Sequence, residues 1–437
     1  MTTRPKPMLL PPLAEILHAT GGLVASVIEG RNFDAVLARA GLTGHVRAAT
    51  MDLAYNSLRA FGRGDFFLGH LLDRPLAEAA PRGLLLAALT RLESRPEDAH
   101  TTVDQAVTAA ARIARGRYKS LVNGVLRNFL RQREQLLDLA AADEVACWQH
   151  PAWWIARLRR DHPDRWQEML RAGNSHPPLC LRANRRRLGS AGDASPTQQL
   201  LAQLDAAGIA ARALDEVAVL LDTPVPLDRI SGFAGGLCSV QDFGAQAAAR
   251  LLDVEDGMRV LDACAAPGGK TSHLLESADI ELTALDADVA RTARIAENLQ
   301  RLGLAATVKV ADAGNPDAWW DGRAFDRILA DVPCSASGVV RRHPDVKWLR
   351  RESDIAGFAA TQARIVDALW RTLAPGGTML YASCSVFAAE NENQVAAFLD
   401  RHADARLTPG GVSANCDAYQ IPDAEHDGFF YALLQKA

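Results

Sequence analysis

Two short segments toward the end of the chain could carry thiol chemistry, because each places a cysteine directly after a strand-like apolar run. The first is DVPCS at 331–335, which contains Cys334, and the second is SCS at 383–385, which contains Cys384. A thiolate is a strong nucleophile, and a strand-to-helix junction or a nearby cation lowers the thiol pKa from about 8.5. The pair therefore predicts nucleophilic catalysis by cysteine. The alternative is that both are buried structural cysteines, the commoner fate of this residue.

A glycine turn lies upstream of the two cysteines, in the run VLDACAAPGGK at 260–270. The run reads as a strand that enters a tight turn, which is a common place for a nucleotide-bearing cofactor. It is not a phosphate-binding P-loop, since that motif needs a glycine where Cys264 stands. The dinucleotide fingerprint GxGxxG is also absent, because the turn has only the adjacent Gly268 and Gly269. A tight turn remains, which can bring backbone close to a ligand.

Aspartates that end successive strands predict how such a cofactor is held. Asp286 ends the second strand of this region, where a carboxylate can accept hydrogen bonds from both ribose hydroxyls of an adenosine. Asp312 follows the third strand and could meet the adenine amine. S-adenosylmethionine fits this layout, since it carries adenosine without a pyrophosphate. An aspartate at a strand end is often only a turn former or a helix cap. Aspartates in register at the ends of several strands nevertheless favour a cofactor site.

These parts together predict methylation of cytosine at C5. That carbon is too weak a nucleophile within the aromatic ring, so a thiolate must first add at C6. The resulting enamine attacks the sulfonium methyl, and a base then removes the C5 proton so that the thiol can leave. Two cysteines and a carboxyl group, Cys384, Cys334 and Asp331, can divide this work. Asp331 could bond N3 or the amine of a flipped base, because the stiff Pro333 aims this segment at the pocket mouth.

The elements expected around these residues form a multidomain chain. Its 437 residues exceed the roughly 250 to 300 at which a single core stops growing. Residues 1–140 predict an all-α domain, 145–235 a small α+β region, and 236–437 a Rossmann-like domain with alternating strands and helices. The last of these predicts a doubly wound parallel sheet with strands at 259–264, 282–286, 307–310, 325–331 and 378–383. Ligands bind at the carboxyl ends of the strands in such sheets.

A stripe of basic residues on a predicted helix could face RNA. From 112 to 133 there are seven basic residues and no acid, and Lys119, Arg127 and Arg131 fall at helical spacing opposite an apolar face. Scattered arginine on a solvated helix face is common, so simple solvation is the alternative. The net charge of −4 gives no global attraction to polyanions, so any RNA site must be local.

Cysteine usage and hydropathy exclude several classes of protein. The seven cysteines form no CxxC pair and lie far apart, which argues against a zinc cluster and a disulfide framework. We therefore expect no metal and a reducing, cytoplasmic environment. No apolar run approaches the roughly 18 residues that would span a bilayer, so we expect no membrane contact. A monomer is expected because no exposed heptad pattern is evident.

Five blocks of sequence carry a family resemblance. They are LVNGVLRN at 121–128, VQD at 240–242, CAAPGGK at 264–270, RRHPD at 341–345 and DGFF at 427–430. With them the chain resembles, over nearly its whole length, the bacterial 16S ribosomal RNA (cytosine-5) methyltransferases of the RsmB type, also called Sun or Fmu. The resemblance implies a NusB-like N-terminal domain that binds RNA. It also implies that Cys384 is the nucleophile and that Cys334 assists release of the methylated base.

The resemblance further implies which residues hold S-adenosylmethionine. They are Cys264, Ala265, Ala266, Pro267, Gly268, Gly269, Lys270, Asp286, Asp312 and Asp331. Arg341 and Arg342 are expected to contact RNA phosphates or to order a loop. The family usually has alanine where Val332 stands and threonine where Ser383 stands, so the packing beside each thiol differs, although no reacting group is lost.

The expected substrate is a cytosine of 16S rRNA, either free or in an early small-subunit assembly intermediate. A tRNA cytosine or another rRNA cytosine would need the same chemistry, and the NusB-like domain favours the ribosomal choice by analogy only. A noncatalytic RNA-binding or antitermination-type protein would have no need of Cys334, Cys384 and Asp331 together. A small-molecule methyltransferase would have no need of two further domains with basic stripes.

Overall fold

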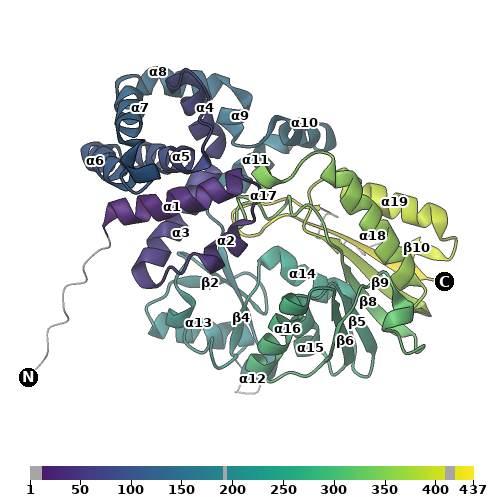
Figure 1. Ribbon diagram of the computed structural model, residues 1–437. Coiled ribbons are helices and arrows are strands. Elements are labelled where there is room, and N and C mark those ends of the chain that lie inside the picture. The colour runs from purple at the N-terminus through teal and green to yellow at the C-terminus, as the bar shows by residue number, and fades with distance from the viewer. Residues whose placement is uncertain (1–11, 190–193, 409–418) are drawn as a thin grey trace, which may run out of the picture. The chain divides into compact units, whose positions relative to one another are not determined.

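The computed structural model describes residues 12–189, 194–408 and 419–437 (Figure 1). The chain divides into two compact units. Unit 1 comprises Met1–Ser175 and Val340–Glu352, and unit 2 comprises His176–Val339 and Ser353–Ala437. A short segment that follows the Cys334 motif in sequence therefore belongs to unit 1, while the sheet strands on both sides of it belong to unit 2.

Unit 1 is built from helices, as the sequence predicts for its N-terminal part. They are α1 (Leu13–Ile28), α2 (Phe33–Arg39), α3 (Gly44–Arg59), α4 (Phe61–Leu71), α5 (Ala79–Ser94), α6 (Ala99–Ala110), α7 (Lys119–Arg131), α8 (Arg133–Ala142), α9 (Glu144–Trp148), α10 (Ala152–Asp161), α11 (Trp166–Asn174) and α17 (Val346–Leu349). The central helix is α5, in which every residue from Leu84 to Leu89 is buried. It packs closely on α1, because a Cβ at Gly83 would lie 2.2 Å from the carbonyl oxygen of Gly21.

The amphipathic pattern of α7 matches the sequence-based expectation. Its buried residues are Val122, Val125, Leu126 and Phe129. The basic side chains of Lys119, Arg127 and Arg131 are all exposed on the opposite side. The helix therefore buries one apolar face in the core of unit 1 and presents a basic face to solvent.

The segment 340–352 is anchored in unit 1 by polar contacts. The carboxylate of Asp345 accepts a hydrogen bond of 3.1 Å from the backbone N–H of Phe33, and Trp348 Nε1 donates to the carbonyl oxygen of Leu58 at 2.8 Å. Lys347 is completely buried, and burial, with a smaller effect of the Arg59 charge, lowers its pKa well below the ordinary value. These contacts fix a piece of chain that begins six residues after Cys334.

Unit 2 contains a small antiparallel sheet, three strands of which fall within the stretch 145–235 expected to be α+β, whereas β4 lies just beyond it and residues up to Ser175 belong to unit 1. Its strands lie in the order β2 (Ala211–Ala213), β3 (Ala218–Leu221), β1 (Leu179–Ala183) and β4 (Cys238–Val240). The helices α12 (Arg185–Leu188) and α13 (Pro196–Ala206) accompany it. The start of α13 is fixed by a capping box between Ser195 and Gln198, which satisfies exposed backbone N–H groups at the helix start.

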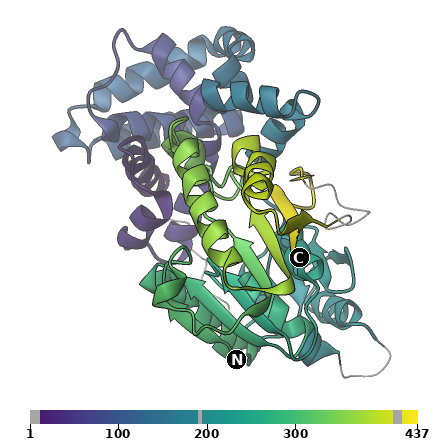
Figure 2. The same cartoon turned by 90° about the vertical axis from the view of Figure 1, so that its right-hand side faces the viewer.

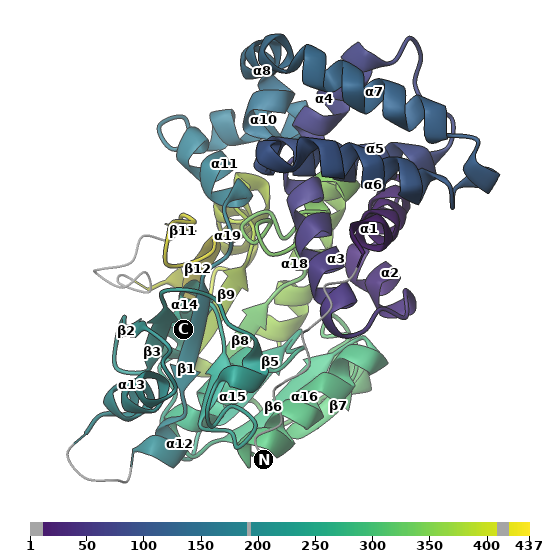
Figure 3. The same ribbon diagram turned by 90° about the vertical axis from the view of Figure 1, so that its left-hand side faces the viewer.

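The large sheet of unit 2 has eight strands. Their order is β10 (Ala405–Leu407), β12 (Phe429–Lys436), β9 (Leu373–Ser383), β8 (Phe325–Asp331), β5 (Arg259–Ala263), β6 (Glu281–Asp286) and β7 (Thr307–Val310), and β11 (Tyr419–Gln420) pairs with β12. Figure 3 shows the run from β9 to β7. The five strands from β9 to β7 are parallel, whereas β12 is antiparallel to β9 and β10 is antiparallel to β12.

The Rossmann-like fold class is confirmed, and the five predicted strands are parallel, whereas β12 and β10, which were not predicted, run antiparallel at one edge. Helices cover both faces of the sheet. They are α14 (Phe243–Leu252), α15 (Gly269–Ser277) and α16 (Val289–Leu302) on one face, and α18 (Asp354–Trp370) and α19 (Glu392–Arg401) on the other (Figure 2). Among the described residues, no helix has both the length and the apolarity needed to cross a membrane.

Candidate active site

The carboxyl ends of the parallel strands bring the chemically interesting side chains of unit 2 to one edge of the sheet. In the register of the sheet, Ala263 of β5 is paired with Ala330 of β8, and Asp331 of β8 with Ala382 of β9. The residues that follow each strand therefore emerge side by side. This edge is the one at which open α/β sheets bind ligands.

The glycine turn after β5 has the backbone conformation of a ligand cradle. Cys264 and Gly268 have positive φ values of 62° and 95°, and α15 begins directly afterwards at Gly269. A Cβ at Gly268 would lie 3.2 Å from the Cα of Ile295, so glycine keeps this approach open. Burial, together with the charges of Asp331 and Asp286, raises the pKa of Cys264 to about 12. The neutral thiol is therefore the favoured form of Cys264.

Asp286 is fixed beside the turn. It is 4% exposed, and its two carboxylate oxygens accept hydrogen bonds from the backbone N–H groups of Ala266 at 3.2 Å and Asp288 at 3.0 Å. Arg291 also lies 3.5 Å from Oδ2 of Asp286. The carboxylate is thus oriented by the turn that it faces, as a ribose-binding acid needs to be.

Asp312 is more exposed than Asp286 and has a cationic partner. Arg364 of α18 donates to its two carboxylate oxygens at 2.9 and 3.2 Å. Partial burial would raise the pKa of Asp312, but the hydrogen bonds from Arg364 and the Gly314 backbone, with the Arg364 charge, bring it below its ordinary value. The residue is ionised and held in place next to the end of β7.

Asp262 is a buried acid, the last residue but one of the strand β5. The sequence analysis assigned it no role. Thr271 donates a hydrogen bond of 2.6 Å to its Oδ2, while Oδ1 has no hydrogen-bond partner within the described part of the chain. Burial is the largest cause that raises its pKa to about 7, and the Thr271 hydrogen bond opposes it. A buried acceptor without a partner is costly, so this atom is suited to a bound polar group.

The two thiols of the sequence motifs are in direct contact. The Sγ atoms of Cys334 and Cys384 lie 3.3 Å apart. The backbone brings their loops together, because Val332 N–H donates to the Ala382 carbonyl at 3.0 Å and Gly338 N–H donates to the Cys384 carbonyl at 2.8 Å. Both cysteines are partly exposed. A thiol at one position can therefore donate a hydrogen bond to a thiolate at the other.

The electrostatics of the pair separate the roles of the two sulfurs. The hydrogen bond to Cys384 is the largest cause that raises the pKa of Cys334 well above its ordinary value, followed by burial and by the charges of Cys384 and Glu390. Cys334 therefore holds its proton more tightly than an ordinary thiol does.

A lysine and an aspartate complete the catalytic edge. Lys270 Nζ lies 2.7 Å from Oδ2 of Asp331. Burial alone would lower the pKa of Lys270, but the charge and hydrogen bond of Asp331, with the charges of Cys384 and Asp262, raise it. The net effect favours the charged form of Lys270, and the Cys384 charge is one of its causes.

A buried glutamate links the two cysteine loops. No sequence pattern predicted this link. Glu390 is fully buried, and its carboxylate accepts hydrogen bonds of 2.6 Å from the hydroxyls of both Ser335 and Ser385. The backbone N–H of Ser335 donates to the same carboxylate at 2.8 Å. These serines directly follow Cys334 and Cys384 in the chain. Glu390 therefore ties the segment after one thiol to the segment after the other.

The residues expected to contact RNA lie in unit 1. Lys119, Arg127 and Arg131 are exposed on α7, and Arg342 is partly exposed. Arg341 is only 1% exposed, which fits the loop-ordering alternative better than phosphate contact. Its carbonyl oxygen accepts a hydrogen bond from Arg59, so this residue belongs to the anchoring of segment 340–352 and is not a surface RNA contact.

Comparisons with known proteins show which family the chain belongs to. Residues 249–435 match the family described as 16S rRNA methyltransferase RsmB/F, residues 150–228 match the ferredoxin-like domain of RsmF/B-like methyltransferases, and residues 23–131 match the NusB family. Ribosomal RNA small subunit methyltransferase B of Serratia proteamaculans is 43% identical over 396 residues, which cover 89% of this chain and 90% of that protein. The chain belongs to the RsmB/F methyltransferase family. The protein of the same name from Escherichia coli O17:K52:H18 is 42% identical over 397 residues, with the same coverage.

Solved structures support the fold of the RsmB/F family member. The crystal structure of PH0851 has a TM-score of 0.79 and 22% identity, and the match covers 98% of this chain and 100% of that one. A methyltransferase homolog protein from Pyrococcus horikoshii has a TM-score of 0.57 and 25% identity, with coverage of 67% and 97%. Family membership confirms the enzyme class and the cofactor, S-adenosylmethionine, that the sequence predicted.

Proposed function

We propose that this enzyme methylates C5 of a cytosine in 16S rRNA through a covalent bond between Cys384 and C6 of the base. The observation that carries the proposal is the 3.3 Å contact between the Cys384 and Cys334 sulfurs at the carboxyl edge of the sheet. A small-molecule methyl acceptor with a reactive heteroatom needs no such pair. The unactivated C5 of cytosine needs two groups, because one must add to the ring at C6 and another must assist its release.

The residues at the end of β5 and β6 fit S-adenosylmethionine. The positive φ at Gly268 leaves room for a ligand beside backbone, Asp286 is oriented by two backbone N–H groups, and Oδ1 of Asp262 is an unsatisfied acceptor. When bound, S-adenosylmethionine supplies an electrophilic methyl group. The predicted roles of Cys264, Lys270, Asp312 and Asp331 in holding it remain part of this proposal.

Cys384 is the proposed nucleophile. Its thiolate forms a bond to C6 of cytosine, and the electron pair of the C5–C6 double bond becomes available at C5. Lys270 lies in the same site and is attracted to the Cys384 charge. Asp331, held by Lys270 at 2.7 Å, is proposed to accept a hydrogen bond from the cytosine amine.

Cys334 is the proposed partner in release. After methylation, a base removes the C5 proton, the double bond re-forms and the bond between Cys384 and C6 breaks. The protonated Cys334 thiol donates toward the departing Cys384 sulfur, which leaves as a thiolate. Asp331 and water are the other candidates for the C5 base.

The substrate class is tested by methylation with labelled S-adenosylmethionine. The full chain is incubated with 16S transcript, isolated small subunits or total tRNA, and the products are digested to nucleosides. We expect labelled 5-methylcytosine from 16S RNA and little label in tRNA. Label in tRNA alone would support the alternative substrate, and absence of label from every RNA would support a noncatalytic RNA-binding protein.

The exposed face of α7 is the proposed RNA contact in unit 1. Charge-removing substitutions of Lys119, Arg127 and Arg131 are expected to weaken RNA binding and to make it less dependent on salt, because each phosphate contact releases counterions. Gel-shift titrations at several salt concentrations measure both effects. Unchanged affinity and salt dependence in the triple variant would show that this face is only solvated.

A further inference from the structure

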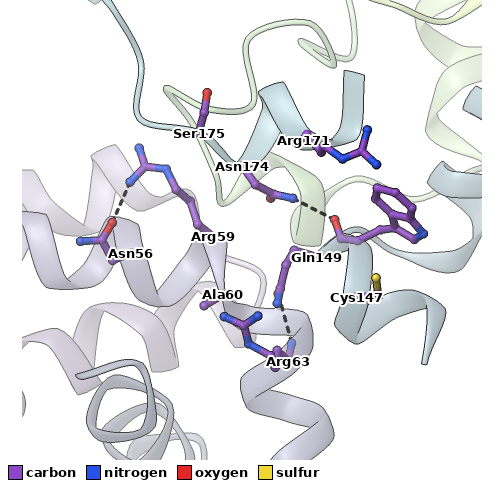
Figure 4. Close-up of a pocket in the computed structure, with 10 residues that line it drawn as sticks. Asn56, Arg59, Ala60, Arg63, Cys147, Gln149, Arg171, Asn174 and Ser175 are labelled. Carbon is purple, nitrogen blue, oxygen red and sulfur yellow. Dashed lines mark hydrogen bonds between the residues drawn. The ribbon is translucent and has the colours of Figure 1, made fainter. Parts of the chain in front are cut away.

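A cavity of about 610 Å³ within unit 1 is lined by arginine, amide and aromatic side chains (Figure 4). We call it the arginine pocket and define it by Arg59, Arg63, Trp148, Gln149, Arg171 and Asn174. Arg59 ends α3, and Arg63 lies in α4. Trp148 ends α9, and Arg171 and Asn174 lie in α11. The volume lies in the range of roughly 300 to 1,000 Å³ that is typical of small-ligand sites.

The pocket has an excess of positive charge. Three of its ten described lining residues are arginines, and none of the ten carries a carboxyl group. Arg63 is neutralised by Glu93, with Nε and Oε1 2.7 Å apart. Arg171 is exposed and has no ion pair within the described residues, while its guanidinium lies 5.2 Å from the ring centroid of Trp148.

Arg59 is a partly buried cation whose hydrogen bonds go to neutral groups. It donates to Oδ1 of Asn56 at 3.2 Å and to the carbonyl oxygen of Arg341 at 2.7 Å. Its Nε has no hydrogen-bond partner among the described residues. Burial lowers the pKa of Arg59, and the opposing charges of Tyr55 and Asp52 do not cancel this effect. An anion that enters the pocket would therefore relieve a desolvated guanidinium.

The wall opposite Arg59 is rigidly built. The side-chain amide of Asn174 donates to the Trp148 carbonyl at 2.9 Å, and its Oδ1 accepts from the buried Lys347 at 2.7 Å. Oε1 of Gln149 accepts from the Arg63 backbone at 3.1 Å. Figure 4 shows the Asn174 side chain between Arg59 and Arg171, and the Gln149 side chain directed toward Arg63. Fixed polar groups lower the entropic cost of binding a ligand in one pose.

We propose that the arginine pocket binds one nucleotide of a single-stranded stretch of the RNA substrate. Its phosphate lies between Arg59 and Arg171, and its base is met by the flat guanidinium and indole groups of Arg171 and Trp148. Bases of single-stranded RNA stack on aromatic rings and on arginine planes, and phosphates take the arginine charge. The inference rests on the proposed function, because it names a second contact of the same RNA.

The first test measures binding without turnover, in the Cys384→Ala background. Arg171→Gln removes one exposed charge from the pocket. Arg95→Gln is the matched control, because Arg95 is another exposed arginine of unit 1 and has no ion pair among the described residues. Fluorescence anisotropy with a 16S transcript is expected to give roughly threefold to tenfold weaker binding for Arg171→Gln, with the salt slope reduced by about one. The control stays within twofold. Equal behaviour of the two variants would overturn the proposal.

The second test reads occupancy of the pocket directly. Cys147 is exposed and lines the cavity, so a ligand there should slow its alkylation by iodoacetamide, followed peptide by peptide by mass spectrometry. We expect protection by saturating RNA, little protection by inorganic phosphate at the same ionic strength, and loss of RNA protection in Arg171→Gln. Equal protection by phosphate alone would reduce the pocket to an anion site. Unprotected Cys147 in an RNA complex that anisotropy detects would refute the pocket and leave the proposed function intact, whereas absence of any RNA binding would count against both.

Discussion

The Sγ atoms of Cys334 and Cys384 lie 3.3 Å apart although the two residues are 50 positions apart in the chain. Their strands, β8 and β9, are parallel neighbours, so the loops that follow them leave the sheet at the same edge. Each loop is then tied to Glu390 through a serine hydroxyl. The two-thiol arrangement is thus a consequence of sheet topology together with one buried carboxylate.

The ion pair between Lys270 and Asp331 controls the charge state of the lysine. In Asp331→Asn the main cause that raises the Lys270 pKa is gone, burial then dominates, and the pKa should fall. The pH dependence of Lys270 acetylation, read by mass spectrometry, measures this shift without requiring activity. Asp312→Asn is the control, because Asp312 pairs with Arg364 and its loss should leave the Lys270 midpoint in place. An unchanged midpoint in Asp331→Asn would contradict the assigned pairing.

Glu390 should be needed for both stability and rate. Glu390→Ala leaves the buried hydroxyls of Ser335 and Ser385 without their acceptor, which we expect to cost roughly 3 kcal/mol of unfolding free energy. The rate at saturating RNA should also fall, because the two thiol loops lose their common anchor. Urea unfolding and single-turnover methylation measure the two effects. Glu392→Ala changes an exposed acid two positions later and should stay within about 0.5 kcal/mol of wild type; similar behaviour of the two variants would argue against the anchor.

Asp262 should make the stability of the cofactor-free enzyme depend on pH. Its folded pKa of about 7 lies above the ordinary value of 3.8, so the folded state keeps a proton that the unfolded state loses. The free energy of unfolding should therefore be highest below about pH 4 and should fall as the pH rises to about 7. The difference between the two pKa values corresponds to a fall of roughly 4 kcal/mol. Asp262→Asn should lack this decline when unfolding free energies are compared from pH 4 to pH 8. Parallel pH profiles of the two proteins would show that Asp262 is ionised in the fold.

Arg182 should connect the small sheet of unit 2 to the glycine turn that follows β5. It is fully buried, pairs with Glu276 at 2.7 Å and donates to the Gly269 carbonyl at 2.8 Å. Arg182→Met leaves the Glu276 charge buried and unpaired, so we expect a loss of roughly 3 to 5 kcal/mol and weaker binding of S-adenosylmethionine. Calorimetric unfolding and cofactor titration measure these quantities. The double variant Arg182→Met, Glu276→Leu should recover part of the stability, and a single variant as stable as wild type would rule out this role.

The sequence predicted those parts of the fold that local patterns encode. The strands β7 and β8 have the expected bounds, and both contain the β-branched or large apolar residues that strands favour. The strand β12 was not predicted, because FFYALLQK at 429–436 has no clear period and its antiparallel direction depends on pairing with β9. Strand direction at a sheet edge is set by tertiary pairing, which a local pattern does not contain.

Site residues that stand in a local sequence motif were predictable. Residues whose importance comes from contacts with other segments of the chain were not. Cys334 and Cys384 stand in recognisable segments, whereas Glu390 gains its importance only from contacts with residues 55 and 5 positions away. The expectation for Arg341 rested on a basic run, and its burial depends on how segment 340–352 packs in unit 1. The partner of Arg182 likewise comes from a distant element, because Glu276 lies 94 positions further along the chain.

The most direct measurement compares wild type, Cys384→Ala and Cys334→Ala after incubation with 16S transcript and methyl-labelled S-adenosylmethionine, on a denaturing gel that resolves protein–RNA adducts. The predicted result is labelled RNA from wild type, no labelled RNA from Cys384→Ala, and a labelled adduct that survives denaturation only with Cys334→Ala. Undiminished methylation of RNA by Cys384→Ala would contradict the nucleophile assignment and with it the two-thiol mechanism.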